Sequence, residues 1–189
     1  ACTNHFYAWA VPFIWVIPQE VAQRGAHISV EENLRRIPPH SVDPTVKNYH
    51  WGDMTAALFN ALDAGYDTTV LLDTNGYITE GPGFNIFAVI DGKVLTPRLG
   101  MLEGISRKTV LEICANLGIP CAEADISLAE FLSADELFTA TTAGGPVPVT
   151  RVNKTILGND AIGPITAQVL KTYWDWHHRD DLTEKIAYI

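Results

Sequence analysis

The feature that most constrains the fold is a pair of short apolar runs joined by Asp91-Gly92. The runs, Phe84–Ile90 and Lys93–Thr96, are rich in residues that favour β-strands. An Asp-Gly pair readily adopts the positive φ angles that a two-residue hairpin turn requires. The sequence therefore predicts an antiparallel hairpin, which any fold for this chain must place in a sheet.

Helices and strands mix along the rest of the chain without the strict alternation of a doubly wound sheet. Hydrophobic periodicity and turn signals predict strands at His27–Ile37, Thr68–Asp73, Ala122–Ile126 and Glu136–Thr141. They predict helices at Asp53–Leu62, Ser106–Leu117, Ser127–Leu132 and Gly163–His178. This order favours an α+β fold with a mixed sheet, and we expect residues 1–189 to form one domain.

An apolar run, Phe6–Val16, precedes these elements and contains Pro12 and several aromatic residues. It predicts a buried strand, kinked or bulged at the proline. The run is too short to span a membrane, and no basic segment precedes it as in a signal peptide. Because the chain enters a core strand almost at once and lacks an initiator Met, we expect upstream sequence to be missing.

The formal net charge of −9 argues against nucleic acid or an anionic membrane as a partner. A bound anion would then need a local device, such as a helix N-terminus. The three cysteines, Cys2, Cys114 and Cys121, show no metal-ligand spacing, so no metal site is expected. Their odd number favours a reducing, cytoplasmic location, and Cys114 falls on the apolar face of a predicted helix.

Two charged residues stand in loops with unusual neighbours. Lys47 follows a segment stiffened by Pro44; most such lysines are solvated, but a desolvated amine with a lowered pKa can form a Schiff base. Glu80 precedes Gly81-Pro82-Gly83, which is either an ordinary turn or a place where backbone brings a carboxylate close to a ligand. A carboxylate in that position can keep a pyridine nitrogen protonated.

Two further segments are rich in small residues. Gly104-Ile105-Ser106 opens a predicted helix, so Ser106 is either its N-cap or part of a phosphate site built on the free N–H groups. Ala140–Gly145 ends a predicted strand and is either a tight turn or a loop that contacts a ligand through backbone and threonine hydroxyls. Each of the four segments alone is a weak signal.

The order of the four segments resembles a family of pyridoxal-5′-phosphate (PLP) enzymes. This family contains branched-chain and D-amino-acid aminotransferases, aminodeoxychorismate lyases and (R)-selective amine transaminases. The resemblance runs from about Phe6 to the C-terminus, and residues 46–53, 79–85 and 141–145 look closest to the (R)-amine transaminases. It implies the mixed-sheet or pseudo-barrel large domain of the D-amino-acid aminotransferase-like enzymes (fold type IV), with the smaller N-terminal domain missing.

The resemblance also implies roles for individual residues. Lys47 would form the Schiff base and move a proton between the substrate Cα and the cofactor C4′. Glu80 would pair with the pyridine nitrogen, and Leu102 would pack against the ring. Further cofactor contacts, including N–H and hydroxyl groups for the phosphate, would come from Ile105, Ser106, Thr141 and Thr142. The substrate pocket would be lined by Trp51, Thr141, Ala143 and Gly144.

One departure concerns a tyrosine that branched-chain enzymes place shortly after the lysine. This chain reads Tyr49-His50-Trp51-Gly52, so that role cannot be assigned to one residue. His50 is structural, solvated or a support for the site, and Trp51 is either a pocket wall or an ordinary core aromatic.

The implied activity is transfer of an amino group between a small-molecule amine and a keto acid such as pyruvate. The Thr-Thr-Ala-Gly-Gly turn favours an (R)-amine or a D-amino acid as the donor. The alternatives are a branched-chain L-amino-acid aminotransferase, an aminodeoxychorismate-type lyase and a non-catalytic protein with the same fold. Family members are homodimers or larger, so we expect a homodimer, with the N-terminal domain completing the site. The Phe6–Trp15 segment would then pack either inside the domain or at the subunit interface.

Overall fold

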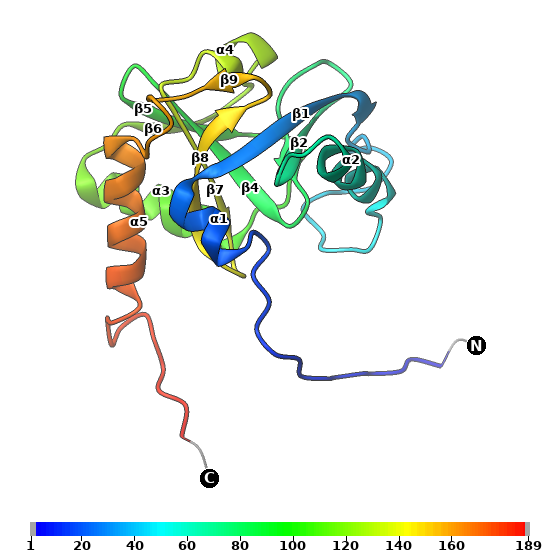
Figure 1. The fold of residues 1–189 in the computed structure, drawn as a ribbon. Coiled ribbons are helices and arrows are strands. Elements are labelled where there is room, and N and C mark those ends of the chain that lie inside the picture. Colours follow the sequence, from blue (N-terminus) through cyan, green and yellow to red (C-terminus); the bar gives the residue numbers. More distant parts are fainter. Residues whose placement is uncertain (1–2, 188–189) are drawn as a thin grey trace.

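The computed structural model describes residues 3–187, and their strands form one sheet (Figure 1). The strands are β1 (Ala26–Arg35), β2 (Thr68–Leu72), β3 (Glu80–Gly81), β4 (Phe84–Ile90), β5 (Lys93–Pro97), β6 (Cys121–Ala124), β7 (Glu136–Thr141), β8 (Gly145–Val152) and β9 (Thr155–Ile156). The helices are α1 (Gln19–Arg24), α2 (Gly52–Asp63), α3 (Ile105–Leu117), α4 (Leu128–Leu132) and α5 (Pro164–Trp176).

The sheet is mixed, as the sequence predicts. Its order is β2-β1-β8-β7-β4-β5-β6, with β3 added to β4 and β9 added to β8. The pairs β1–β2, β1–β8 and β5–β6 are parallel, and the other pairs are antiparallel. The β4–β5 hairpin turns at Asp91 (φ 50°) and Gly92 (φ 73°), as the Asp-Gly pair predicts.

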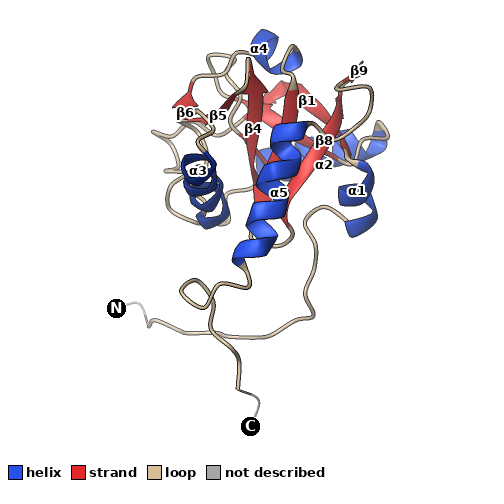
Figure 2. Ribbon diagram, turned by 90° about the vertical axis from the view of Figure 1, so that its left-hand side faces the viewer, coloured by secondary structure: helices blue, strands red, loops and turns tan. Residues whose placement is uncertain are grey.

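Both faces of the sheet are covered, which explains why β4 is apolar throughout. Ile86 and Ala88 face a core that α1 and α4 help to close, whereas Phe87 faces a second core under α3 and α5. On that second face Phe87 stacks on Phe138 of β7, with ring centroids 4.7 Å apart. Figure 2 shows α5 lying across the sheet, with α3 beside it.

The helix predicted at Asp53–Leu62 is present, but a different face of it is buried. Met54, Leu58 and Leu62 recur at the i, i+4, i+8 spacing of one helix face, yet Leu62 is exposed. The residues of α2 that meet the sheet are Met54, Ala57 and Ala61, which are buried. The two alanines leave room for a close approach between α2 and Leu71 of β2.

The strand β8 is not predicted by the sequence pattern, because Pro146 and Pro148 argue against a central strand. The structure accommodates them because β1 pairs with β8 only from Val149 onward. The prolines therefore need no N–H group on the side that faces β1.

The predicted strand at Phe6–Val16 is wrong. This segment runs extended from the body of the domain (Figure 1), and Phe6 and Trp9 are 91% and 76% exposed. Among the described residues it has one backbone attachment, from Val16 N to Ala143 O at 3.0 Å. A strand needs a neighbouring strand along its length, and the described residues offer none there. Only the end of the segment, at Trp15 and Val16, contacts the domain.

Cys114 is buried under the second face, as predicted, whereas Cys2 lies outside the described residues. Within residues 3–187, no helix combines the length and apolar character that crossing a membrane requires.

Candidate active site

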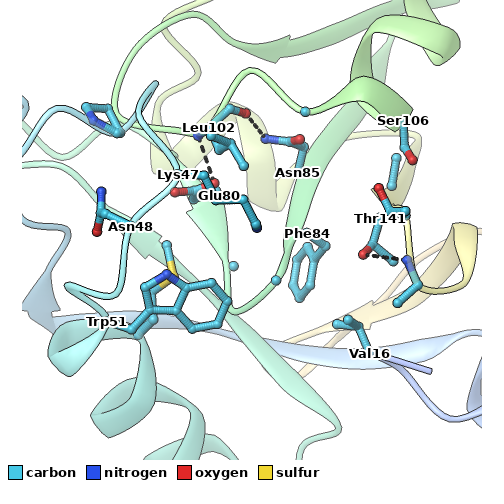
Figure 3. A pocket seen from close by; sticks show the side chains of 18 of the residues that line it. Val16, Lys47, Asn48, Trp51, Glu80, Phe84, Asn85, Leu102, Ser106 and Thr141 are labelled. Atoms are coloured by element: carbon cyan, nitrogen blue, oxygen red, sulfur yellow. Dashed lines mark hydrogen bonds between the residues drawn. The ribbon is translucent and has the colours of Figure 1, made fainter. Parts of the chain in front are cut away.

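A cavity of about 290 Å³ lies where β3, β4, β7, the segment before α2 and the start of α3 meet (Figure 3). The strand register gathers its walls: Glu80 pairs with Asn85, and Asn85 pairs with Ala140 across β3, β4 and β7. Of the predicted site residues, those that line the cavity are Lys47, Trp51, Glu80, Leu102, Ser106, Thr141, Thr142 and Ala143. Ile105 and Gly144 are not among the lining residues.

Lys47 reaches the cavity on the loop that connects β1 to α2. The Asn48 side chain donates a hydrogen bond to Val46 O (2.7 Å), which braces the turn around the lysine. Lys47 itself is exposed at the cavity mouth. Tyr49 is 96% exposed and does not line the cavity, whereas Trp51 does, which favours the pocket-wall interpretation of Trp51.

Glu80 is buried at the base of the cavity and has two partners. Its Oε2 accepts a hydrogen bond from Leu102 N (3.0 Å), and its Oε1 lies 3.4 Å from Nε of Arg36. Burial raises the pKa of the Glu80 carboxyl, while the Leu102 N–H and Arg36 act in the opposite direction. The sequence analysis missed Arg36, because no motif around Arg36 indicates that it pairs with Glu80, which is 44 positions away.

The backbone of Leu102 is held on both sides. Leu102 N donates to Glu80, and Leu102 O accepts a hydrogen bond from Asn85 Nδ2 (2.8 Å; Figure 3). Asn85 also explains Gly104, because a Cβ there would lie 2.4 Å from Asn85 Oδ1. Asn85 belongs to the segment 79–85 that the sequence analysis singled out, but its hydrogen-bond partner, Leu102, lies in the segment before α3.

The start of α3 rules out the interpretation of Ser106 as the helix N-cap. Gly104 is the N-cap, so Ser106 is the second residue of the helix and does not cap it. The first backbone hydrogen bond of this turn runs from Lys108 N to Gly104 O, so the earlier N–H groups have no partner within the helix. Ile105 is 81% exposed and does not line the cavity. The buried Ser106 hydroxyl lies 3.2 Å from the hydroxyl of Tyr173.

The turn after β7 forms the opposite wall. Thr141 is buried, and its Oγ1 accepts a hydrogen bond from Ala143 N (3.3 Å), while Thr142 is exposed. Gly144 has φ 141° and is buried behind the turn, where a Cβ would lie 3.1 Å from the Trp15 ring. The turn and the N-terminal segment therefore meet at the rim of the cavity.

These contacts define a site with a specific chemistry. The base holds one guanidinium and two carboxyl groups, from Arg36, Glu80 and Asp53. With both carboxyl groups ionised, this buried group would carry one net negative charge. A cationic ring nitrogen beside Glu80 would compensate that charge. Across the cavity, the start of α3 presents N–H groups and a hydroxyl suited to an anion.

Comparison with known proteins agrees with this description. Residues 11–152 match the family model for class IV amino-transferases. A probable branched-chain-amino-acid aminotransferase of Thermotoga maritima is 35% identical over 153 residues, covering 80% of this chain and 55% of that protein. The Escherichia coli branched-chain amino acid aminotransferase superposes with a TM-score of 0.83 at 28% identity, covering 87% of this chain and 55% of that one. The branched-chain amino acid aminotransferase from Thermobaculum terrenum, in its PLP form, gives a TM-score of 0.76 at 30% identity, with coverages of 80% and 50%.

The chain therefore belongs to the class IV aminotransferase family and has the mixed α+β fold of that family. Members of this class are PLP-dependent transferases, which confirms the family and the cofactor predicted from the sequence. The relatives described above are branched-chain aminotransferases, whereas the predicted closeness was to (R)-selective amine transaminases. The chain spans about half the length of these relatives.

The residues present fit PLP. Glu80 would hold the ring nitrogen, Leu102 would lie against the ring, and Ser106 with the first N–H groups of α3 would hold the phosphate. Lys47 lines the same cavity as these groups and would be the amine that meets the cofactor aldehyde.

Proposed function

We propose that the protein containing this chain is a PLP-dependent transaminase, with residues 1–189 as its cofactor-binding large domain and an N-terminal domain completing the site. The observation that carries this proposal is the convergence of Lys47, the buried carboxylate of Glu80 and the start of α3 on one cavity. PLP, when bound, supplies an electron sink that stabilises negative charge on the substrate carbon.

The chain's own residues would position and protonate the reacting groups. Glu80 would hold a proton on the ring nitrogen through a buried ion pair. Ser106 and the N–H groups of α3 would bind the phosphate. Lys47 Nζ would accept the proton from the substrate Cα and hold it for return to the reacting group.

For the substrate, we infer a branched-chain L-amino acid. The similar proteins named above support this choice, and apolar side chains line much of the cavity, including Val16, Trp51 and Phe84. An (R)-amine or D-amino acid is the second candidate. It is supported by the Thr141–Gly145 turn, which resembles the (R)-amine transaminases and forms one cavity wall.

The cofactor assignment is tested by trapping PLP on the full-length protein with borohydride. We expect a mass increase on the peptide that contains Lys47, and loss of both the adduct and transaminase turnover in Lys47→Ala. Lys171→Ala is the matched control, because Lys171 is exposed on α5 and pairs with Asp175. A Lys47→Ala protein that retains full turnover would contradict the proposal.

The substrate assignment is tested with enantiomeric pairs. Turnover of L-leucine and D-leucine with 2-oxoglutarate or pyruvate would be compared with turnover of (R)- and (S)-1-phenylethylamine. We expect the highest kcat/KM for L-leucine. A dominant rate with the (R)-amine or the D-amino acid would replace the branched-chain assignment by the second candidate.

A homodimer remains a prediction, and so does a cytoplasmic location. The exposed aromatic side chains of the N-terminal segment, which include Phe6, Tyr7 and Trp9, support a role in subunit contact. Sedimentation of the full-length protein with Phe6→Ser and Trp9→Ser would test this, with weaker self-association as the expected result. An unchanged association constant would place the interface elsewhere.

A further inference from the structure

Arg36 lies between two buried carboxylates at the base of the cavity. Its Nη1 is 2.7 Å from Asp53 Oδ2, and its Nε is 3.4 Å from Glu80 Oε1. The arginine side chain is 6% exposed, and each carboxylate side chain is 8% exposed. Such a buried group of charges is costly to desolvate, so it is retained only where its members are well paired or have a function.

Asp53 also joins the two ends of the loop that carries Lys47. It is the second residue of α2, and its Oδ2 accepts a hydrogen bond from Ile37 N (2.8 Å) as well as from Arg36. Its Oδ1 accepts a hydrogen bond from Met54 N (2.8 Å). One carboxylate therefore connects the chain that leaves β1 to the start of α2, and so closes the base of the Lys47 loop.

Arg36 is the cation among the groups that set the pKa of the Glu80 carboxyl. The groups that act on Glu80 are Arg36 from the end of β1, Asp53 from α2 and the Leu102 N–H before α3. Burial and Asp53 both raise the pKa of the Glu80 carboxyl, whereas Arg36 and the Leu102 N–H lower it. Arg36 is the cation that opposes burial, and a protonated Glu80 could not hold a proton on a ring nitrogen.

We propose that Arg36 and Asp53 are positioning residues: Arg36 keeps Glu80 ionised and aimed at the cavity, and Asp53 fixes Arg36 while closing the loop that presents Lys47. This inference rests on the proposed function. One buried ion network thus holds Glu80 and, through the contact of Asp53 with Ile37 N, the base of the loop that carries Lys47.

The first test measures Glu80 directly, in the cofactor-free, full-length protein with ¹³C-labelled glutamate carboxyl groups. Glu80→Gln identifies the Glu80 signal, which is then titrated by NMR in the wild type, Arg36→Met and Arg36→Lys. We expect the Glu80 titration to move to higher pH in Arg36→Met and to move less in Arg36→Lys, which keeps the charge. Arg98→Met is the control, because Arg98 pairs with Asp125 and is not among the groups that act on the Glu80 carboxyl.

Identical Glu80 titrations in the wild type and Arg36→Met would overturn the role of Arg36. Because Arg36→Met leaves Asp53 buried without its cation, it can fail to fold. Arg36→Lys then decides the matter: a Glu80 titration moved to higher pH in a folded Arg36→Lys protein supports the role of Arg36, and a titration equal to that of the wild type overturns it.

The second test concerns Asp53 and the loop. We expect Asp53→Asn to speed amide hydrogen exchange in residues 37–51 and to raise the Kd for PLP about tenfold, the loss expected from a charged hydrogen bond. Asp125→Asn, which removes a half-buried carboxylate paired with Arg98, should leave both unchanged. Unaltered exchange in the loop of Asp53→Asn would overturn the role assigned to this residue.

Trapping PLP with borohydride separates this inference from the proposed function. If Lys47 forms the reduced adduct but Glu80 titrates without regard to Arg36, the inference alone fails. If Lys47 forms no adduct in the wild type, the proposed function fails, and the cofactor-facing part of the inference fails with it.

Discussion

The side-chain amide of Asn85 donates a hydrogen bond to the main-chain oxygen of Leu102 at 2.8 Å. The Oδ1 of the same amide lies close to Gly104, where a Cβ would be only 2.4 Å from it. The strand β4 thereby sets both the position of Leu102 and the point at which α3 begins. The wall against which the cofactor ring would lie is thus built on a rigid strand and not on a free loop.

Gly104→Ala should lower the free energy of unfolding by about 1–3 kcal/mol, because the buried Asn85 amide must move and lose a hydrogen bond. Urea denaturation of the cofactor-free protein measures this loss. Gly52→Ala is the control, since a Cβ at Gly52 would meet no atom within 4 Å. The loss should shrink in an Asn85→Ala background, and an equal loss in both backgrounds would show that the clash is not its cause.

Ser106 and Tyr173 should matter for the phosphate group specifically. Their hydroxyls lie 3.2 Å apart beside the free N–H groups of α3. We expect Ser106→Ala and Tyr173→Phe each to raise the Kd for PLP about fivefold, the value of one net hydrogen bond, without changing the Kd for pyridoxal, which lacks the phosphate. Fluorescence titration of the full-length protein compares the two ligands.

Thr109→Ala is the matched control for this comparison, because the Thr109 hydroxyl is exposed on α3 and bonds only Ile105 O. If Ser106→Ala weakened PLP and pyridoxal equally, the phosphate would have to lie elsewhere in the cavity.

Glu80 should make stability depend on pH. Burial raises the pKa of its carboxyl above the ordinary value of 4.5. The folded state therefore holds this proton more tightly than the unfolded state, so the stability contributed by the protonated carboxyl is present below that value and is lost as the pH rises through the folded pKa.

We accordingly expect Glu80→Gln to gain stability relative to the wild type as the pH rises from about 4.5, and the gain to level off above the folded pKa. Urea unfolding of the cofactor-free protein at a series of pH values measures the difference. Glu112→Gln, on the exposed face of α3, is the control for removing one carboxylate. A difference between Glu80→Gln and the wild type that stayed constant with pH would contradict this prediction.

Much of the fold could be predicted because its signals are local. Asp91-Gly92 specifies a hairpin through the φ angles of two residues, and Gly118 ends α3 in the left-handed conformation. The segment Phe6–Val16 could not be predicted correctly, because an apolar run does not say where its partner lies. In the same way, the prolines of β8 are tolerated only because of where β1 stops pairing.

The candidate site divides along the same line. Local composition marked Lys47, Glu80 and the small-residue turns only weakly, and the order of the four segments along the chain, through its resemblance to a family, made them candidates for one site. The ion network of Arg36, Asp53 and Glu80 joins residues 17 and 44 positions apart in the chain. Such contacts depend on strand register and on how α2 packs, which no short stretch of sequence encodes. The chain's local chemistry therefore specified the elements and the reactive groups, and tertiary packing decided which charges meet and which of them are buried.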